Sequence, residues 1–404
     1  MNISQYTNRG VVITFPESVA IDPAVNPENI APGVVIHPGT RIRGAGTSIG
    51  PGCVIGSEAP ATVENCQLGC NVSLKGGYFS DATFLDNSSM GSGAHVRTGT
   101  LLEEYASAAH SVGLKQTIFM PFVTAGSLIN FCDCLMAGGT DRKNHSEIGS
   151  SYIHFNFTPR QDKATASLIG DVPRGVMLNR QPVFLGGQGG LVGPARIAFG
   201  TTIAAGTICR EDVLDEDTLY LPSKPAPDRI QNYNPSLCFG IRRVLRNNII
   251  YIGNLIALTA WYRNVRSRYS ESDRYARACF EGALTRLQSG LDERIRQLDR
   301  LVHHIPHSLE LADTLDDFPE DLRRQQQSLL RQWPALKENL CLEVPDDTGI
   351  QSRDLFLEEW ESLQREMKYT DAVKRLSPDA GAAGTEWLQA IVDYTASLWP
   401  NSDI

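Results

Sequence analysis

Apolar residues recur at every sixth position through much of the first half of the chain. A period of six fits neither the alternation of a strand nor the 3.6-residue repeat of a helix. It fits a triangular coil, in which each six-residue side points one apolar residue inwards and tight Gly, Asn, Asp and Pro corners join the sides. The pattern therefore predicts a left-handed parallel β-helix over residues 30–222. The two longest runs of anchors are Tyr78, Phe84, Met90, Val96 and Leu102, and Leu185, Leu191, Ile197, Ile203 and Cys209.

The six-residue phase breaks at three places, which are residues 134–146, 157–165 and 172–182. Such breaks indicate loops inserted into a solenoid, and functional residues tend to lie on loops of this kind. Residues 1–29 precede the regular anchors, and we expect them to form an N-terminal cap.

The composition changes after residue 232, where glycine becomes sparse and apolar residues recur at a spacing of three and four residues. This spacing predicts an α-helical C-terminal domain over residues 232–404, after a proline-rich linker at 222–235. The predicted fold class is therefore an all-β left-handed parallel β-helix followed by an α-helical domain. The expected helices are 242–265, 272–305, 319–340, 354–375 and 386–398, the last one following a break at Gly381–Gly384.

The charge balance narrows the range of partners. The 404 residues include 37 Lys and Arg against 46 Asp and Glu, a formal net charge of −9, which argues against nucleic acid as a partner. The longest apolar run, residues 249–262, is shorter than the roughly 20 residues that a membrane span needs. The N-terminus does not resemble a secretory signal, so we expect a cytoplasmic protein with no membrane partner.

Three longer segments carry a resemblance to a known family. They read RTGTLLEEYASAAHSVGLKQTIFMPFVTAGSLINFCD, SEIGSSYIHFNFTPRQDKATASLIGD and VFLGGQGGLVGPARIAFGTTIAAGTI. Over residues 30–215 the chain resembles the hexapeptide-repeat acyltransferase superfamily, and within it the acetyltransferase half of the bacterial bifunctional enzyme of UDP-N-acetylglucosamine biosynthesis. The resemblance implies a homotrimer that acetylates a sugar phosphate or nucleotide sugar with acetyl-CoA, at an active site between β-helix subunits.

The resemblance also implies roles for particular residues. An Arg and a Lys eighteen positions apart hold the sugar phosphate in that family, and Arg97 and Lys115 have this spacing. Asn156 matches a sugar-binding Asn, and Asn130 stands where the family has a Tyr near its base. The remaining candidates are Lys163 for the substrate, and Gly187, Ala204, Ala205 and Arg180 for acetyl-CoA.

The chain departs from the family at the catalytic base. The family histidine follows an Ala-Gly pair, and Ser127 occupies that position here. A serine hydroxyl does not accept a proton from an amine as an imidazole does. The candidate replacement is His145, because it lies in the inserted loop DRKNHSEIG, while His154 alternates with aromatic residues and is expected to pack within a coil.

Two other classes of function stay open. A protein that has lost its base could persist as a non-catalytic sugar-phosphate-binding or scaffold protein. A zinc carbonic anhydrase of similar shape would need an HxxxxH pair, which His95, His110, His145 and His154 do not form. The nine cysteines include no CxxC pair, so we expect no metal site.

Overall fold

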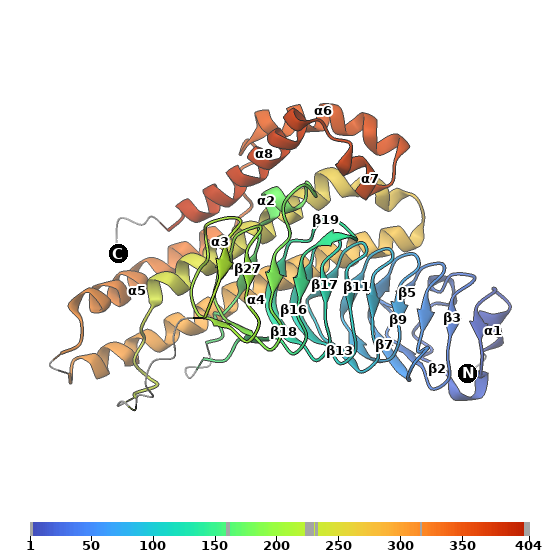
Figure 1. Cartoon of the computed structure of the whole chain (residues 1–404), viewed down its shortest axis with the longest axis horizontal. Coiled ribbons are helices and arrows are strands. Elements are labelled where there is room, and N and C mark those ends of the chain that lie inside the picture. The colour runs from blue at the N-terminus through green and yellow to red at the C-terminus, as the bar shows by residue number, and fades with distance from the viewer. Residues whose placement is uncertain (1–2, 159–161, 223–229, 231–232, 316, 400–404) are drawn as a thin grey trace.

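The computed structural model describes residues 3–158, 162–222, 230, 233–315 and 317–399. It contains a parallel β-solenoid followed by a bundle of long helices, which confirms the predicted fold class of a left-handed β-helix and an α-helical C-terminal part (Figure 1). Most of the predicted linker, residues 223–229 and 231–232, lies outside the described residues.

The coil has three faces, which we call A, B and C in the order in which the chain visits them. Face A is a sheet of its own, whereas faces B and C are joined because β16 (Gly113–Phe119) and β18 (Asn130–Met136) continue around the corner between them. Face A consists of β1 (Val12–Ile13), β3 (Val35–Ile36), β6 (Val54–Ile55), β9 (Ser73–Leu74), β12 (Ser89–Met90), β15 (Ser107–Ala108), β17 (Thr124–Ala125), β21 (Glu147–Ile148), β24 (Phe184–Leu185), β27 (Thr202–Ile203) and β29 (Leu219–Tyr220).

The strands of the other two faces pair in the same parallel fashion. Face B consists of β2 (Ala20–Ile21), β4 (Arg41–Arg43), β7 (Ala61–Glu64), β10 (Gly77–Ser80), β13 (Ala94–Val96), the first parts of β16 and β18, β22 (Ile153–Phe155), β25 (Gly190–Val192) and β28 (Ile208–Cys209). Face C consists of β5 (Ser48–Ile49), β8 (Gln67–Leu68), β11 (Ala82–Phe84), β14 (Thr100–Leu102), the second parts of β16 and β18, β23 (Ser167–Ile169) and β26 (Arg196–Ile197). The corners between faces are named the A/B, B/C and C/A edges.

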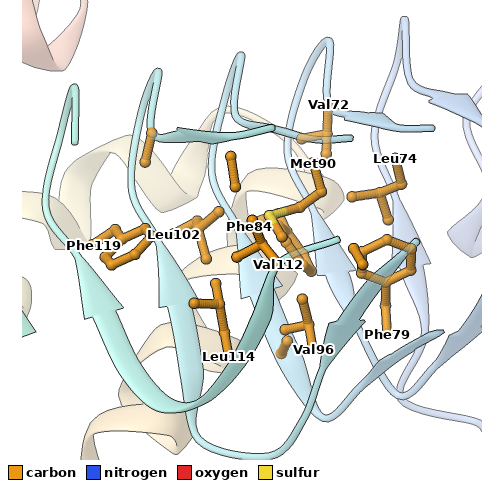
Figure 2. Packing of buried hydrophobic residues seen from close by; sticks show 14 of the residues in the cluster. Val72, Leu74, Phe79, Phe84, Met90, Val96, Leu102, Val112, Leu114 and Phe119 are labelled. Atoms are coloured by element: carbon orange, nitrogen blue, oxygen red, sulfur yellow. The ribbon is translucent and has the colours of Figure 1, made fainter. Parts of the chain in front are cut away.

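The interior of the coil is a continuous stack of buried side chains, nearly all apolar, to which all three faces contribute (Figure 2). Phe84 and Leu102, for example, are neighbours in register on face C and are both fully buried. The six-residue anchors therefore identify the interior, with one correction. Phe79 rather than Tyr78 points inwards, because only five residues separate Leu74 from the next anchor.

The expected N-terminal boundary of the coil needs adjusting. The coil begins within the expected cap of residues 1–29, because Val12 pairs with Val35 and Ala20 with Arg41. A short helix, α1 (Ser4–Thr7), precedes these strands. One 3-10 turn, Pro16–Ser18, lies between β1 and β2, and a second, Pro27–Asn29, follows β2.

The helices pack directly on the coil. Face C carries a second, outward row of buried apolar residues that belongs to the same cluster as the helices, so coil and helices share a core. Close approach is possible at Gly282, where a Cβ atom would lie 2.4 Å from Oε1 of Gln67 on face C. The helices are α2 (Val172–Gly175), α3 (Ile241–Trp261), α4 (Arg274–Ala312), α5 (Glu320–Cys341), α6 (Ile350–Glu366), α7 (Tyr369–Lys374) and α8 (Pro378–Ser397), with a π-helical turn at Tyr262–Arg266 and a 3-10 turn at Ser267–Glu271 between α3 and α4.

The expected helix break at Gly381–Gly384 does not occur. Both glycines lie inside α8, and a Cβ atom at Gly384 would come within 2.5 Å of Cε of Met177. Gly384 therefore serves close packing rather than chain reversal. The predicted helix 354–375 is instead divided at Met367 into α6 and α7.

Candidate functional site

Arg97 and Lys115 lie next to each other on the outside of face B. The residues before them, Val96 and Leu114, pair in register and point into the coil, so the two cations occupy the same outward position in successive turns. Cys132 follows in the next turn, paired with Lys115. Burial raises the pKa of the Cys132 thiol, and the charges of Arg97 and Lys115 act against that rise.

This pair of cations is available to an anion. Arg97 is exposed and Lys115 half-buried, and among the described residues neither forms an ion pair. A guanidinium can donate two parallel hydrogen bonds to phosphate oxygens, and an ammonium adds a compact charge beside them. The predicted phosphate site is therefore brought together by the coil, and its composition suits a phosphomonoester or a diphosphate.

Asn156 lies beyond the end of face B, where its amide is used within the chain. Its Nδ2 donates to Oδ2 of Asp133 at 2.8 Å, and Arg294 of α4 donates to Oδ1 of the same carboxylate at 2.6 Å. Burial alone would raise the pKa of Asp133, but Arg294 and Asn156 outweigh it and hold that pKa below its ordinary value. Asp133 thus joins the coil to α4, with Asn156 as its partner within the coil. Lys163 is an exposed residue on the same B/C edge.

The A/B edge gathers four of the predicted residues and one that the prediction missed. His110 lies one turn below Ser127, and its Nδ1 is 3.0 Å from the Ser127 hydroxyl. The backbone nitrogen of Ser127 donates to the hydroxyl of Ser150 in the following turn at 3.1 Å. A histidine is therefore within hydrogen-bond distance of the position at which the resembling family carries its base.

The other predicted residues of this edge occupy the next turns. Gln188 donates its backbone N–H to the carbonyl of Ser150, and Gly206 donates to Gly187, so the same stack continues through Gly187 to Ala204 and Ala205. These small residues leave the backbone of the edge open over two turns, an arrangement that lets an extended ligand lie close to the coil. Asn130 is exposed at the first position of face B, beside this edge.

His145 and Arg180 lie at the C/A edge, away from Ser127. His145 belongs to a small hairpin formed by β19 (Gly139–Asp141) and β20 (Asn144–His145), and its Nδ1 is 2.9 Å from the carbonyl oxygen of Arg142. The hairpin follows face C and precedes face A, so within one chain it cannot stand opposite Ser127 at the A/B edge. Arg180 lies near α8, in a cavity that Pro378 and Gly381 also line.

His154 is a core residue, as the sequence predicted. It occupies the inward position of face B between Phe131 and Leu191 and is 2 % exposed. Its Nε2 is 2.8 Å from the hydroxyl of Ser167. Burial lowers the pKa of His154 to about 4, against the opposing charge of Asp133, so the imidazole is neutral near pH 7.

Two further findings bear on the alternatives. Among the described residues, no three His, Cys, Asp or Glu side chains lie close enough together to hold a metal ion. In the same part of the chain, no helix has both the length and the apolar character of a membrane span.

Comparison with known proteins places the coil among bacterial relatives. No family model matches the chain. The bifunctional protein GlmU of Pelobacter propionicus is 30 % identical over 205 residues, covering 50 % of this chain and 39 % of the relative, and that of Synechococcus elongatus is 29 % identical over 211 residues, covering 52 % and 41 %. The chain thus spans about two fifths of the length of these relatives.

A solved structure shows a more distant likeness. The UDP-N-acetylglucosamine O-acyltransferase LpxA of Moraxella catarrhalis is 12 % identical, covers 68 % of this chain and 96 % of its own, and superposes with a TM-score of 0.26. The sequence relatives, together with the parallel coil, confirm the predicted resemblance. The β-helix of this chain is related to the hexapeptide-repeat acyltransferases through the bifunctional GlmU proteins.

Proposed function

We propose that the chain is an acyltransferase that moves an acetyl group from acetyl-CoA to the amino group of a sugar phosphate or nucleotide sugar. The observation that carries this proposal is the hydrogen bond between His110 and Ser127. The family position of the base has lost its imidazole, yet an imidazole lies one turn below it on the same edge. The relationship to the GlmU proteins supports the reaction class.

His110 acts as the general base in this proposal. With Nδ1–H donating to the Ser127 hydroxyl, the Nε2 lone pair faces outwards and can take a proton from the attacking amine. The amine nitrogen forms a bond to the thioester carbonyl carbon and the carbon–sulfur bond breaks. The departing thiolate takes the proton from the His110 imidazolium and leaves as coenzyme A. The edge formed by Gly187, Ala204 and Ala205 accommodates the acyl donor.

The complete site needs a second chain. His110 lies in the A/B corner before β16 and Lys115 lies within that strand, so five residues, at most about 16 Å of extended chain, separate them. A hexosamine phosphate is too short to reach both. A neighbouring subunit that lays its A/B edge beside face B would bring the base of one chain to the cations of the other, and a homotrimer of this kind is part of the proposal.

Two alternatives follow from particular residues. His145 could serve as the base if the C/A edge of a neighbouring chain approaches Ser127. The loss of the family histidine at position 127 favours a second function, in which the chain binds sugar phosphates without turning them over.

The test is release of coenzyme A from acetyl-CoA with glucosamine 1-phosphate as acceptor. His110→Ala is expected to lower kcat by about 10²–10⁴-fold with a smaller change in KM, because it removes the base and leaves the cations in place. His145→Ala is the matched control and should keep its activity. Arg97→Glu should raise KM strongly.

The opposite pattern is equally informative. Loss of activity in His145→Ala with His110→Ala unaffected would move the base to the hairpin of a neighbouring chain. Binding of amino-sugar phosphates with no turnover of any of them would favour the non-catalytic function.

A further inference from the structure

A cavity of about 690 Å³ lies between the B/C edge of the coil and helices α3 and α4. We infer that it binds the uncharged, hydroxyl-rich part of a glycosyl phosphate, so that the helical part of the chain selects the sugar. The phosphate would rest on Arg97 and Lys115, and in that respect the inference rests on the proposed function. The lining residues used below are Thr98, Gln116, Thr285, Gln288, Ser289 and Asp292.

Gln116 is the clearest sign of a missing ligand. Its side chain is only 7 % exposed, and its Oε1 is buried with no hydrogen-bond partner. A buried amide oxygen without a donor is destabilising, and few native groups are left in this condition without a reason. A hydroxyl group of a ligand in the cavity would supply the missing donor.

Two glycines lie beside the Gln116 amide. Gly99 has a φ of +76°, and a Cβ atom there would lie 2.4 Å from Cδ of Gln116. Gly290 of α4 stands on the other side, where a Cβ atom would lie 3.9 Å from Oε1. Because neither glycine has a side chain, the Gln116 amide can pack between the coil and α4.

The wall opposite Gln116 is polar and carries a single carboxylate, that of Asp292. Thr285, Gln288, Ser289 and Asp292 follow a three- and four-residue spacing and therefore share one face of α4. Gln288 already donates to Asp292 at 2.8 Å. Hydroxyl, amide and carboxylate groups in this mixture donate and accept hydrogen bonds in turn, which suits the hydroxyl groups of a sugar.

The other charged residues that line the cavity each have a partner of opposite charge. Glu293 pairs with Arg296 on the same helix, and Arg263 of α3 lies 3.5 Å from Glu343. An anionic ligand would gain little within the cavity itself. The lining thus favours the neutral part of a ligand and leaves the anionic part to face B.

The position of the cavity agrees with a ligand that spans both places. Thr98 directly follows Arg97, and Gln116 directly follows Lys115, so each cation is one residue, about 3.5 Å of chain, from a residue that lines the cavity. A phosphate held by the cations would have its attached sugar at the mouth of the cavity. A single glycosyl phosphate is long enough for this.

The test measures binding by isothermal titration calorimetry with the full chain, using glucosamine 1-phosphate, glucosamine and inorganic phosphate as probes. Ser289→Trp fills the cavity and should weaken glucosamine 1-phosphate at least 10-fold while leaving inorganic phosphate unchanged. Gln116→Leu should weaken it about 5-fold, the value of one lost neutral hydrogen bond. Glu281→Trp is the control, since Glu281 is exposed on α4 and outside the cavity lining.

A second cavity variant, Thr285→Trp, protects the test against misfolding because Thr285 is exposed. If both tryptophan variants keep their affinity for glucosamine 1-phosphate while Arg97→Glu loses it, the cavity is not the sugar site and the proposed function stands. Loss of glucosamine binding in the tryptophan variants, with no effect of Arg97→Glu on any probe, would keep a sugar site in the cavity and overturn the phosphate site.

Discussion

Faces B and C of the coil belong to one sheet and share β16 and β18, yet their outward side chains differ in burial. On face C the outward residues Leu101, Ile118, Leu135 and Leu168 are at most 4 % exposed, because α3 and α4 cover them. On face B, His95 and Asn130 are exposed, and Ile153 remains 40 % exposed. The comparison shows that the outward residues of a solenoid indicate which faces are covered, because a covered face has apolar side chains at these positions.

The difference is visible in the sequence once the coil phase is known. Four strands of face C beyond residue 100, which are β14, β16, β18 and β23, carry two adjacent apolar residues, as in Leu101-Leu102 and Ile118-Phe119. One member of each pair fills the coil, and the other packs against a helix. A strand buried on both sides loses its alternation in this way.

The largest expected effect comes from the ion pair that fastens α4 to the coil. Arg294→Met should lower the free energy of unfolding by about 3–5 kcal/mol, because it leaves Asp133, 6 % exposed, as a buried carboxylate without its cation. Urea unfolding of the variant measures this loss. The double variant Asp133→Asn with Arg294→Met should recover much of it, and a loss below 1 kcal/mol in the single variant would contradict the buried pair.

The second prediction compares the outward rows directly. Leu135→Ala on face C should cost about 2–5 kcal/mol, since the side chain is fully buried under the helices. Ile153→Ala on face B should cost less than about 1 kcal/mol in dilute protein, because much of that side chain is in solvent. Equal costs at low concentration would break the comparison, and a cost for Ile153→Ala that grows with protein concentration would show that a second copy covers face B.

The smallest effect concerns the interior beneath face B and depends on pH. The pKa of His154 is lowered from 6.5 to about 4 in the folded chain, so the unfolded chain binds the proton more readily. Stability is therefore fully present above pH 6.5 and falls as the pH drops through about 4, by up to about 3 kcal/mol. In His154→Leu the free energy of unfolding, measured by urea denaturation at several pH values, should depend less on pH over this range. An unchanged pH dependence would show that other groups cause the loss of stability in acid.

The sequence was most informative where one residue type repeats with the coil. The apolar anchors predicted the interior, and the spacing of eighteen between Arg97 and Lys115 equals one turn, which is why they stack. His110 precedes Ser127 by seventeen residues, again about one turn, and this spacing was the available signal for it. The loop of His145 interrupts the six-residue repeat, but such an interruption does not indicate from which edge of the coil the loop projects.

Other features could not be predicted because they depend on contacts between distant segments. Arg294 has the pattern of an ordinary helical charge, and its pairing with Asp133 appears only when α4 is placed on the coil. The same holds for Gln116, whose amide lies near Gly290, more than 170 residues away.

The length of α4 changes how the coil is expected to come apart. Turns of a solenoid contact only their neighbours, so they can fray one by one from an end. The 39 residues of α4 extend for about 58 Å and pack on β5, β8, β11 and β14, one strand from each of four successive turns. Because α4 contacts all four turns, opening any one of them disrupts the packing of the helix on the others. We therefore expect this stretch of the coil to unfold as one cooperative unit.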